Sequence, residues 1–268
     1  MTKKESLAIL DEQYSYIVNF RLPRLMGIFR EKPHEFDRLT LPILWADHEK
    51  IALYRLLFEK NIPAAKQEFY NCGTLTTYGV LRFGYWPKDK KAEYIEPDVK
   101  VDYMGFVSHF SYLLLSDCEA LIQQYSTLRH QWWDEKTKDG LLVYARAIQC
   151  ILLDDWESLE KHLIQFDKQA KRYKSAQHSK EFFIGMLEKD IGKVKRSIET
   201  MCEKRYSRHN PFLANLIALP AAGYAKLAWL KGMQVQIDSP LVPMELMPIA
   251  PLEEYVNPYE RFWRLGED

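Results

Sequence analysis

The sequence predicts an all-α protein: stacked antiparallel helical hairpins, in a tetratricopeptide-like repeat arrangement, around a buried, proline-kinked helix near 211–231. Three observations lead to this prediction. Apolar residues recur at spacings of three and four through nearly every segment, which is the period of an amphipathic helix. One segment, 210–232, is apolar on almost all sides. An acid-led pattern also recurs between residues 117 and 198, at a period typical of helix-turn-helix units.

The N-terminal part is expected to form helical segments separated by prolines, glycines or charged turns. Ser6 can cap the first helix, which should end at Pro23 because proline lacks an N–H donor and collides with the preceding turn. The connection 86–97 is the one long segment without helical periodicity. The expected helical ranges are 6–22, 24–30, 40–59 and 61–81.

The repeated pattern consists of an acid, an adjacent apolar residue, and further apolar residues three and seven positions beyond that one. The copies begin at Asp117, Asp155 and Asp190, which lie 38 and 35 residues apart, and Asn61 begins a looser fourth copy. An acid at this place is a natural N-cap for the helix that follows. The pattern predicts stacked hairpins without the full tetratricopeptide consensus. The helices expected here are about 102–115, 117–132, 138–153, 156–173, 178–188 and 190–206.

The segment 211–231 is expected to form one helix with both ends marked. Asn210 is a good N-cap, Pro211 suits the first helical position, and Gly232 is placed for a C-terminal cap. Pro220 would lie in the middle and kink the helix. Because the helix leaves almost no face for water, it should be buried among other helices. Its clearly polar residues are Asn215, Lys226 and Lys231.

The remaining features are consistent with a single all-α domain over residues 1–268, with a subdivision into 1–97 and 98–268 left open. Short helices are expected near 243–248 and 251–263, and only 233–237 has some strand-like alternation. Lys226 and the absence of a second apolar run argue against a membrane span, and the charged N-terminus does not resemble a signal peptide. The expected location is therefore the cytoplasm, and no oligomeric state is predicted.

The net charge is zero, with 37 basic and 37 acidic residues, which argues against a nucleic-acid partner. The charge is nevertheless unevenly distributed. Between residues 161 and 208 there are 13 Lys and Arg against 6 Asp and Glu, whereas from residue 233 to the end there are 7 acids against two arginines. Either patch could face a partner or complement the other within the fold.

Motifs for catalysis, cofactors or metals are missing, so we predict no catalytic, cofactor-binding or metal-ligating residues. Asp47-His48-Glu49 is interpreted as a partly buried histidine flanked by surface acids, and Asp154-Asp155 as a helix cap. The widely spaced cysteines are expected to be reduced core thiols. An aromatic cluster that includes Tyr85 and Trp132 fits core packing, a ligand pocket or an interaction surface.

The segment from Leu216 to Val235, followed by Asp238 to Leu246, resembles the C-terminal signature of all-α immunity proteins of bacterial polymorphic toxin systems, and most closely the immunity protein 49 family. In that family an apolar, alanine-rich helix containing Leu-Pro ends in a Lys/Arg-Gly pair. A short extended stretch then leads to another helix start. The resemblance covers about the last 120 residues, although the usual tyrosine before the Pro243 helix is absent here.

The resemblance implies a non-enzymatic, cytoplasmic protein that binds and neutralises a co-encoded protein toxin. Two alternatives stay open: a helical-repeat scaffold or regulator of an endogenous protein, and an enzyme with an aromatic-lined pocket. For a toxin partner, charge points to an acidic tail and to a basic helix end, with a preference for the tail together with the loop 87–97. The candidate partner-binding residues are Glu245, Glu253, Glu254, Glu260, Lys171, Arg172 and Lys174.

Overall fold

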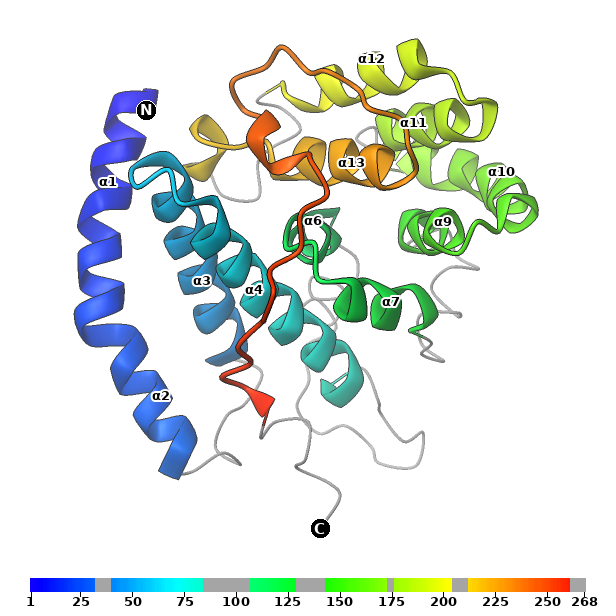
Figure 1. Ribbon diagram of the computed structural model, residues 1–268. Helices are drawn as coiled ribbons and strands as arrows, with labels where there is room; N and C mark the ends of the chain where they lie inside the picture. The colour runs from blue at the N-terminus through cyan, green and yellow to red at the C-terminus, as the bar shows by residue number, and fades with distance from the viewer. Residues whose placement is uncertain (32–39, 84–106, 129–142, 173–175, 204–211, 261–268) are drawn as a thin grey trace.

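The computed structural model describes residues 1–31, 40–83, 107–128, 143–172, 176–203 and 212–260 (Figure 1). Regular structure in these ranges is helical throughout, which confirms the all-α class; the stretch 233–237 is irregular and not a strand. The α-helices are α1 (Lys3–Tyr16), α2 (Leu22–Glu31), α3 (Thr40–Leu57), α4 (Ile62–Phe83), α6 (Val107–Leu115), α7 (Glu119–Thr127), α9 (Val143–Leu152), α10 (Trp156–Arg172), α11 (Ala176–Glu188), α12 (Ile191–Met201) and α13 (Leu219–Leu230). The shorter elements are a π-helix, η1 (Ile17–Arg21), and two 3-10 turns, η3 (Leu213–Asn215) and η4 (Met244–Leu246).

Helices α1 and α2 are continuous through Pro23, so the predicted helix end at this proline is wrong. The π turn η1 lies immediately before it, and the N–H of Leu22 bonds the carbonyl of Ile17. In a π turn the N–H bonds the carbonyl five residues earlier instead of four. This change of hydrogen-bond register next to Pro23, which has no N–H donor, lets the helix continue. The first cap is also displaced, because Thr2 and Glu5 form a capping box and Ser6 is buried inside the helix.

The helical hairpins share one turn geometry. A residue with positive φ ends the first helix and the next residue starts the second; the positive-φ residues are Lys60, Asp117, Asp154 and Lys189. Three of the starting residues cap their helices through a side-chain oxygen: Asn61, Asp155 and Asp190 accept a backbone N–H at 2.9–3.1 Å. Capping by the acid is therefore confirmed at Asp155 and Asp190. The finer prediction of a tetratricopeptide-like repeat arrangement stays a prediction.

Asp117 does not play the predicted capping role. The sequence pattern is offset by one residue, because the N-cap of α7 is Cys118, which makes no side-chain cap bond. Asp117 instead occupies the positive-φ position and is only 3% exposed. A carboxylate that does not cap a helix and is withdrawn from water must have partners elsewhere in the fold.

Helix α13 is buried on all sides, as predicted, but it is shorter than expected and carries no mid-helix kink. Pro220 lies in its first turn, where the missing N–H costs no hydrogen bond, and Asn210 and Pro211 lie outside the described residues. Gly232 ends the helix as predicted, with φ +78°. Its N–H bonds the carbonyl of Trp229, and the next N–H bonds that of Ala228, which is a Schellman cap.

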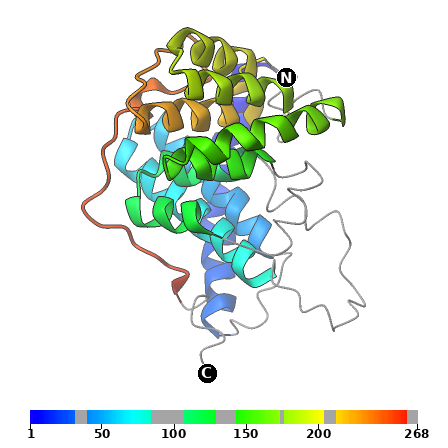
Figure 2. The same ribbon diagram turned by 90° about the vertical axis from the view of Figure 1, so that its right-hand side faces the viewer.

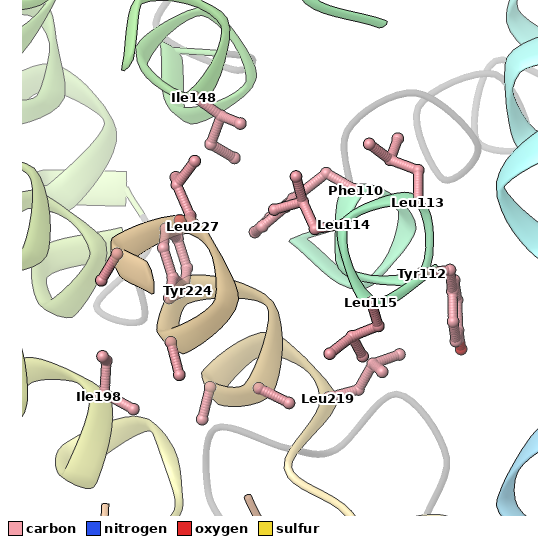
Figure 3. Close-up of a cluster of buried hydrophobic side chains, with 14 of the residues drawn as sticks. Phe110, Tyr112, Leu113, Leu114, Leu115, Ile148, Ile198, Leu219, Tyr224 and Leu227 are labelled. Carbon is pink, nitrogen blue, oxygen red and sulfur yellow. The ribbon is translucent and has the colours of Figure 1, made fainter. Parts of the chain in front are cut away.

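The core lies where α13 crosses α6 (Figure 3). Tyr224 contacts Phe110 of α6 and Phe182 of α11, with ring centroids 5.2 and 4.5 Å apart. At the crossing, a Cβ added to Gly223 would lie 2.1 Å from the hydroxyl of Ser111, so only glycine allows this approach. Leu227 is fully buried beside Tyr224, as predicted.

From one side of the molecule to the other, α1 packs on α3, α3 on α4, α4 on α6, and α6 on α13. Helices α10 to α13 lie at one end and α2 at the other (Figure 2). Over residues 251–259 the chain does not form the expected helix but runs in irregular form across this stack, and the rest of the expected range, 261–263, lies outside the described residues. Prolines 248, 251 and 258 remove three backbone donors from this segment, which explains why no helix forms there.

Candidate partner-binding surface

We define the C-terminal strap as residues 247–260, which follow η4 and cross α4 and the α6–α7 turn towards the lower end of α3 and α4 (Figure 1). Backbone without regular structure needs hydrogen-bond partners where it packs on a protein surface. In the strap these partners are side chains of the helices beneath it. They occur at its beginning, its middle and its end.

The beginning of the strap is held by a buried cluster of two lysines and one aspartate. The ammonium of Lys226 in α13 lies 2.6 Å from one carboxylate oxygen of Asp117, and that of Lys66 in α4 lies 2.6 Å from the other. All three side chains are at most 3% exposed. Buried charges need partners of opposite sign or strong dipoles.

Backbone carbonyls of the strap region balance the positive charge left over in this cluster. Lys226 donates to the carbonyls of Leu246, Met247 and Pro248 at 2.8, 3.1 and 3.0 Å. Lys66 donates to the carbonyl of Ala250 at 2.7 Å, and the N–H of Ala250 donates to Asp117 at 3.2 Å. Burial lowers the pKa of Lys226 to about 8, although the hydrogen bond and charge of Asp117 act in the opposite direction.

The middle of the strap is held by two neutral side chains. The amide of Gln67 accepts a hydrogen bond from the N–H of Val256 at 3.0 Å and donates one to its carbonyl at 2.8 Å. The hydroxyl of Tyr255 donates to the carbonyl of Ser116 at 2.7 Å and accepts from the N–H of Leu252 at 3.0 Å. Burial raises the pKa of Tyr255 to about 12, so it stays a donor at neutral pH.

The end of the strap is held by Tyr259, which is 1% exposed and packs on Phe29. Its hydroxyl lies 2.5 Å from Nε2 of His48, and Nδ1 of the same ring lies 2.5 Å from Glu68. Each ring nitrogen of His48 therefore has an oxygen partner, the carboxylate of Glu68 at Nδ1 and the hydroxyl of Tyr259 at Nε2. Sequence reasoning missed this contact, because the two partners lie at opposite ends of the chain.

The interpretation of Asp47-His48-Glu49 is therefore wrong in one respect. The flanking acids are not on the surface: Asp47 is 0% and Glu49 is 2% exposed. Asp47 forms a two-pronged ion pair with Arg21 of η1. Adjacent helical positions point in different directions, and here Asp47 meets Arg21 whereas His48 meets Glu68 and Tyr259.

The outer side of the strap region is acidic and partly apolar. Glu245, Glu253, Glu254 and Glu260 are all exposed, and the sequence from 233 to 260 contains no Lys or Arg. Within the described part of the chain, no ion pair is found for Glu253 or Glu254. Ile249 and Val256 are also exposed, by 54% and 63%. The structure thus presents the four acids on a backbone that is fixed from beneath.

The other candidates are less fully described. Lys171 and Arg172 lie in the last turn of α10. Lys174, the loop 87–97 and the aromatic residues Tyr85 and Trp132 lie outside the described residues. None of the four cysteines is joined in a disulfide, and Cys72, Cys118 and Cys150 are buried, as expected for core thiols.

The described residues contain no cluster of His, Cys, Asp and Glu suited to a metal ion. No helix among them is both long enough and apolar enough to cross a membrane.

The comparison with family models decides the family. The model of immunity protein 49 matches residues 64–246, which is more than half of the chain. This chain belongs to the immunity protein 49 family. The match begins well before the last 120 residues, to which the sequence resemblance had been assigned. No curated protein and no solved structure matches the chain.

The matched range runs from the start of α4 to η4. It contains Lys66, Asp117 and Lys226, which hold the strap, and it contains Glu245. The strap itself, with Glu253, Glu254 and Glu260, follows the matched range. In this member of the immunity protein 49 family, Lys66, Asp117 and Lys226 within the matched range therefore hold the strap, which lies beyond that range.

Proposed function

We propose that this chain binds a protein toxin encoded beside it and neutralises the toxin by non-covalent occlusion in the cytoplasm, without catalysing a reaction. Membership of the immunity protein 49 family is the observation that carries this proposal. A protein that acts by occlusion needs a stable fold and a fixed complementary surface. The buried helical core supports the first requirement, and the anchored strap offers a fixed surface for the second.

The binding surface that we favour is the acidic surface formed by Glu245 of η4 and the exposed acids of the C-terminal strap. Its acids, Glu245, Glu253, Glu254 and Glu260, are exposed on backbone whose polar groups are bound by Lys226, Lys66 and Gln67. A surface that is ordered before binding loses less conformational entropy on association. A row of carboxylates also accelerates the encounter with a basic partner. This chemistry suits a cationic toxin that cleaves nucleic acid, because carboxylates can imitate a phosphate backbone.

The alternative surface is the basic end of α10, with Lys171 and Arg172, together with Lys174, which follows it in the sequence. It would suit an acidic toxin face or a site that normally binds phosphate. Charge reversal distinguishes the two surfaces, since only the one in contact should alter the association rate.

Co-expression tests the function. The neighbouring toxin gene is expressed in a sensitive host with and without this chain, and growth is measured. Restored growth, together with recovery of a complex of the two purified proteins, supports the proposal. If growth is not restored and affinity capture from a strain that lacks the toxin recovers housekeeping proteins, a scaffold or regulator is the better explanation.

A further inference from the structure

A groove adjoins the beginning of the acidic surface. It has a volume of about 460 Å³ and is bounded by α1, the end of α3, the approach to α13 and the loop 237–245. Its base is apolar and consists of buried side chains, among them Leu53, Leu56, Ile217 and Val242. This volume lies within the range of pockets that bind small ligands.

The exposed charges at the groove have opposite signs on its two sides, with the cations on the N-terminal segments and the anions on the loop 237–245. Lys3 of α1 and Lys60 of the α3–α4 turn contribute positive charge. Asp238 and Glu245 of the loop contribute negative charge. Asp238 is already paired with Lys195, at 3.0 Å, so Glu245 supplies the more available carboxylate. An occupant that complements this groove is apolar in its centre and carries one cationic and one anionic group beside that centre.

Glu245 belongs to both the groove and the acidic surface of the strap region. A protein that covers both Glu245 and the strap would therefore also border the groove, which favours a segment of that same protein over an independent small molecule. An apolar side chain inserted in a pocket and surrounded by polar contacts is typical of the centre of a protein interface.

We propose that the groove receives one apolar side chain of the toxin, which the toxin presents between an anionic group facing Lys60 and a cationic group facing Glu245. This inference rests on the proposed function, because it names the part of the toxin that the immunity protein holds. In this arrangement the acids of the strap attract the toxin electrostatically, and the groove binds the apolar side chain that anchors it.

Filling the groove tests the anchor. Leu57 lines the groove and is half-buried, so Leu57→Trp should obstruct it. Phe58, the next residue, is 42% exposed, lies just after the end of α3 and does not line the groove, so Phe58→Trp is a control at the adjacent position. The probe is the purified toxin domain encoded by the neighbouring gene. We expect Leu57→Trp to weaken the affinity at least tenfold and Phe58→Trp to change it less than twofold.

Lys60→Glu tests the predicted polarity at an exposed position. If the strap alone bound a cationic toxin, an added acid would leave the affinity unchanged or raise it. The groove proposal requires the opposite. The affinity should fall at least threefold, because the anionic group of the toxin would face a carboxylate at position 60 in place of the lysine. Glu245→Lys should also weaken binding.

The outcomes separate the two proposals. If the parent protein does not bind the toxin, both the function and the groove proposal are wrong. If the parent binds, and if folded Leu57→Trp or Lys60→Glu binds as tightly as the parent, the groove proposal is wrong and the function stands. Circular dichroism and melting temperature establish folding, and Lys60→Glu decides alone if Leu57→Trp does not fold.

Discussion

The ammonium of Lys226 lies 2.6 Å from the carboxylate of Asp117, although α13 and the α6–α7 turn are far apart in the sequence. The same ammonium meets three consecutive carbonyls between residues 246 and 248. The three N–H donors of this ammonium thus meet three carbonyl oxygens, and the ion pair with Asp117 compensates its charge. This relationship joins the buried helix to the exposed strap and leads to the first prediction.

Lys226→Met should loosen the strap. The three carbonyls lose their donor, whereas Asp117 keeps Lys66 as a partner. We expect the free energy of unfolding to fall by about 2–4 kcal/mol, the usual range for leaving buried polar groups without partners. Hydrogen exchange at residues 246–252 should become faster, and toxin affinity should fall.

Lys231→Met is the matched control, because Lys231 follows the same helix and its ion pair with Asp154 is partly exposed. A loss of no more than about 1 kcal/mol is expected there. Equal exchange rates in the strap of the parent and of Lys226→Met would contradict the role assigned to Lys226.

The stability that Lys226 contributes should depend on pH. Its pKa is about 8 in the folded protein, below the ordinary value of 10.5, because burial disfavours the charged form. Between these values the unfolded chain retains a proton that the folded chain has released. The contribution of Lys226 to folding therefore rises with pH in this window, by at most about 1.4 kcal/mol per pH unit.

Denaturant unfolding of the parent and of Lys226→Met at pH 7, 8 and 9 measures this effect. Subtracting the unfolding free energy of Lys226→Met from that of the parent at each pH cancels the contributions of other titrating groups, including the buried tyrosines. It should increase above pH 8 in favour of the parent. A difference that stays constant over this range would show that Lys226 keeps its proton.

Charge reversal on the strap should affect binding but not folding. Glu253 and Glu254 are exposed, so changing both to Lys should shift the melting temperature little. Association with a cationic toxin should become slower, and the difference should shrink as salt is added, because the effect is electrostatic. Stopped-flow or surface-binding kinetics at two salt concentrations measure this. An unchanged association rate would direct attention to the basic end of α10.

Truncation in the core should have the opposite effect. Leu227 is fully buried, so Leu227→Ala should lower the free energy of unfolding by about 2–5 kcal/mol through lost burial and a residual cavity. Soluble yield should fall, while toxin affinity per folded molecule should match the parent. A variant that melts like the parent yet loses binding would show that α13 contacts the toxin directly.

Gly223→Ala should destabilise the protein although alanine favours helices. The new Cβ would lie 2.1 Å from the hydroxyl and 2.8 Å from the Cα of Ser111, so α6 and α13 must separate. Overpacking of this kind costs about 1–3 kcal/mol or more. Gly27 in α2 has no neighbouring atom within 4 Å of an added Cβ. Gly27→Ala should therefore be neutral or stabilising by up to about 1 kcal/mol, and thermal melting of both variants checks the contrast.

The sequence by itself determined the features that depend on neighbouring residues. Helical periodicity specified the all-α class, and the oxygen side chains of Asp155 and Asp190 specified two helix starts. Gly232 specified the end of α13, because a positive φ is least costly for glycine. The apolar composition of that helix also predicted its burial, since no face remained for water. The two stretches that carry the family resemblance, 216–235 and 238–246, are local patterns of the same kind.

Only the tertiary structure decided the features that depend on distant partners. Pro220 suits either a kink or a first turn, and the chain before α13 decides between them. Asp117 looked like a cap because its local pattern matched that of Asp155, yet Lys66 and Lys226 withdraw it into the interior. His48 likewise acquires its role from Tyr259, near the other end of the sequence. A buried charge or hydroxyl is stabilised by whichever group the fold brings within about 3 Å. The spacing of residues along the chain does not predict which group that is.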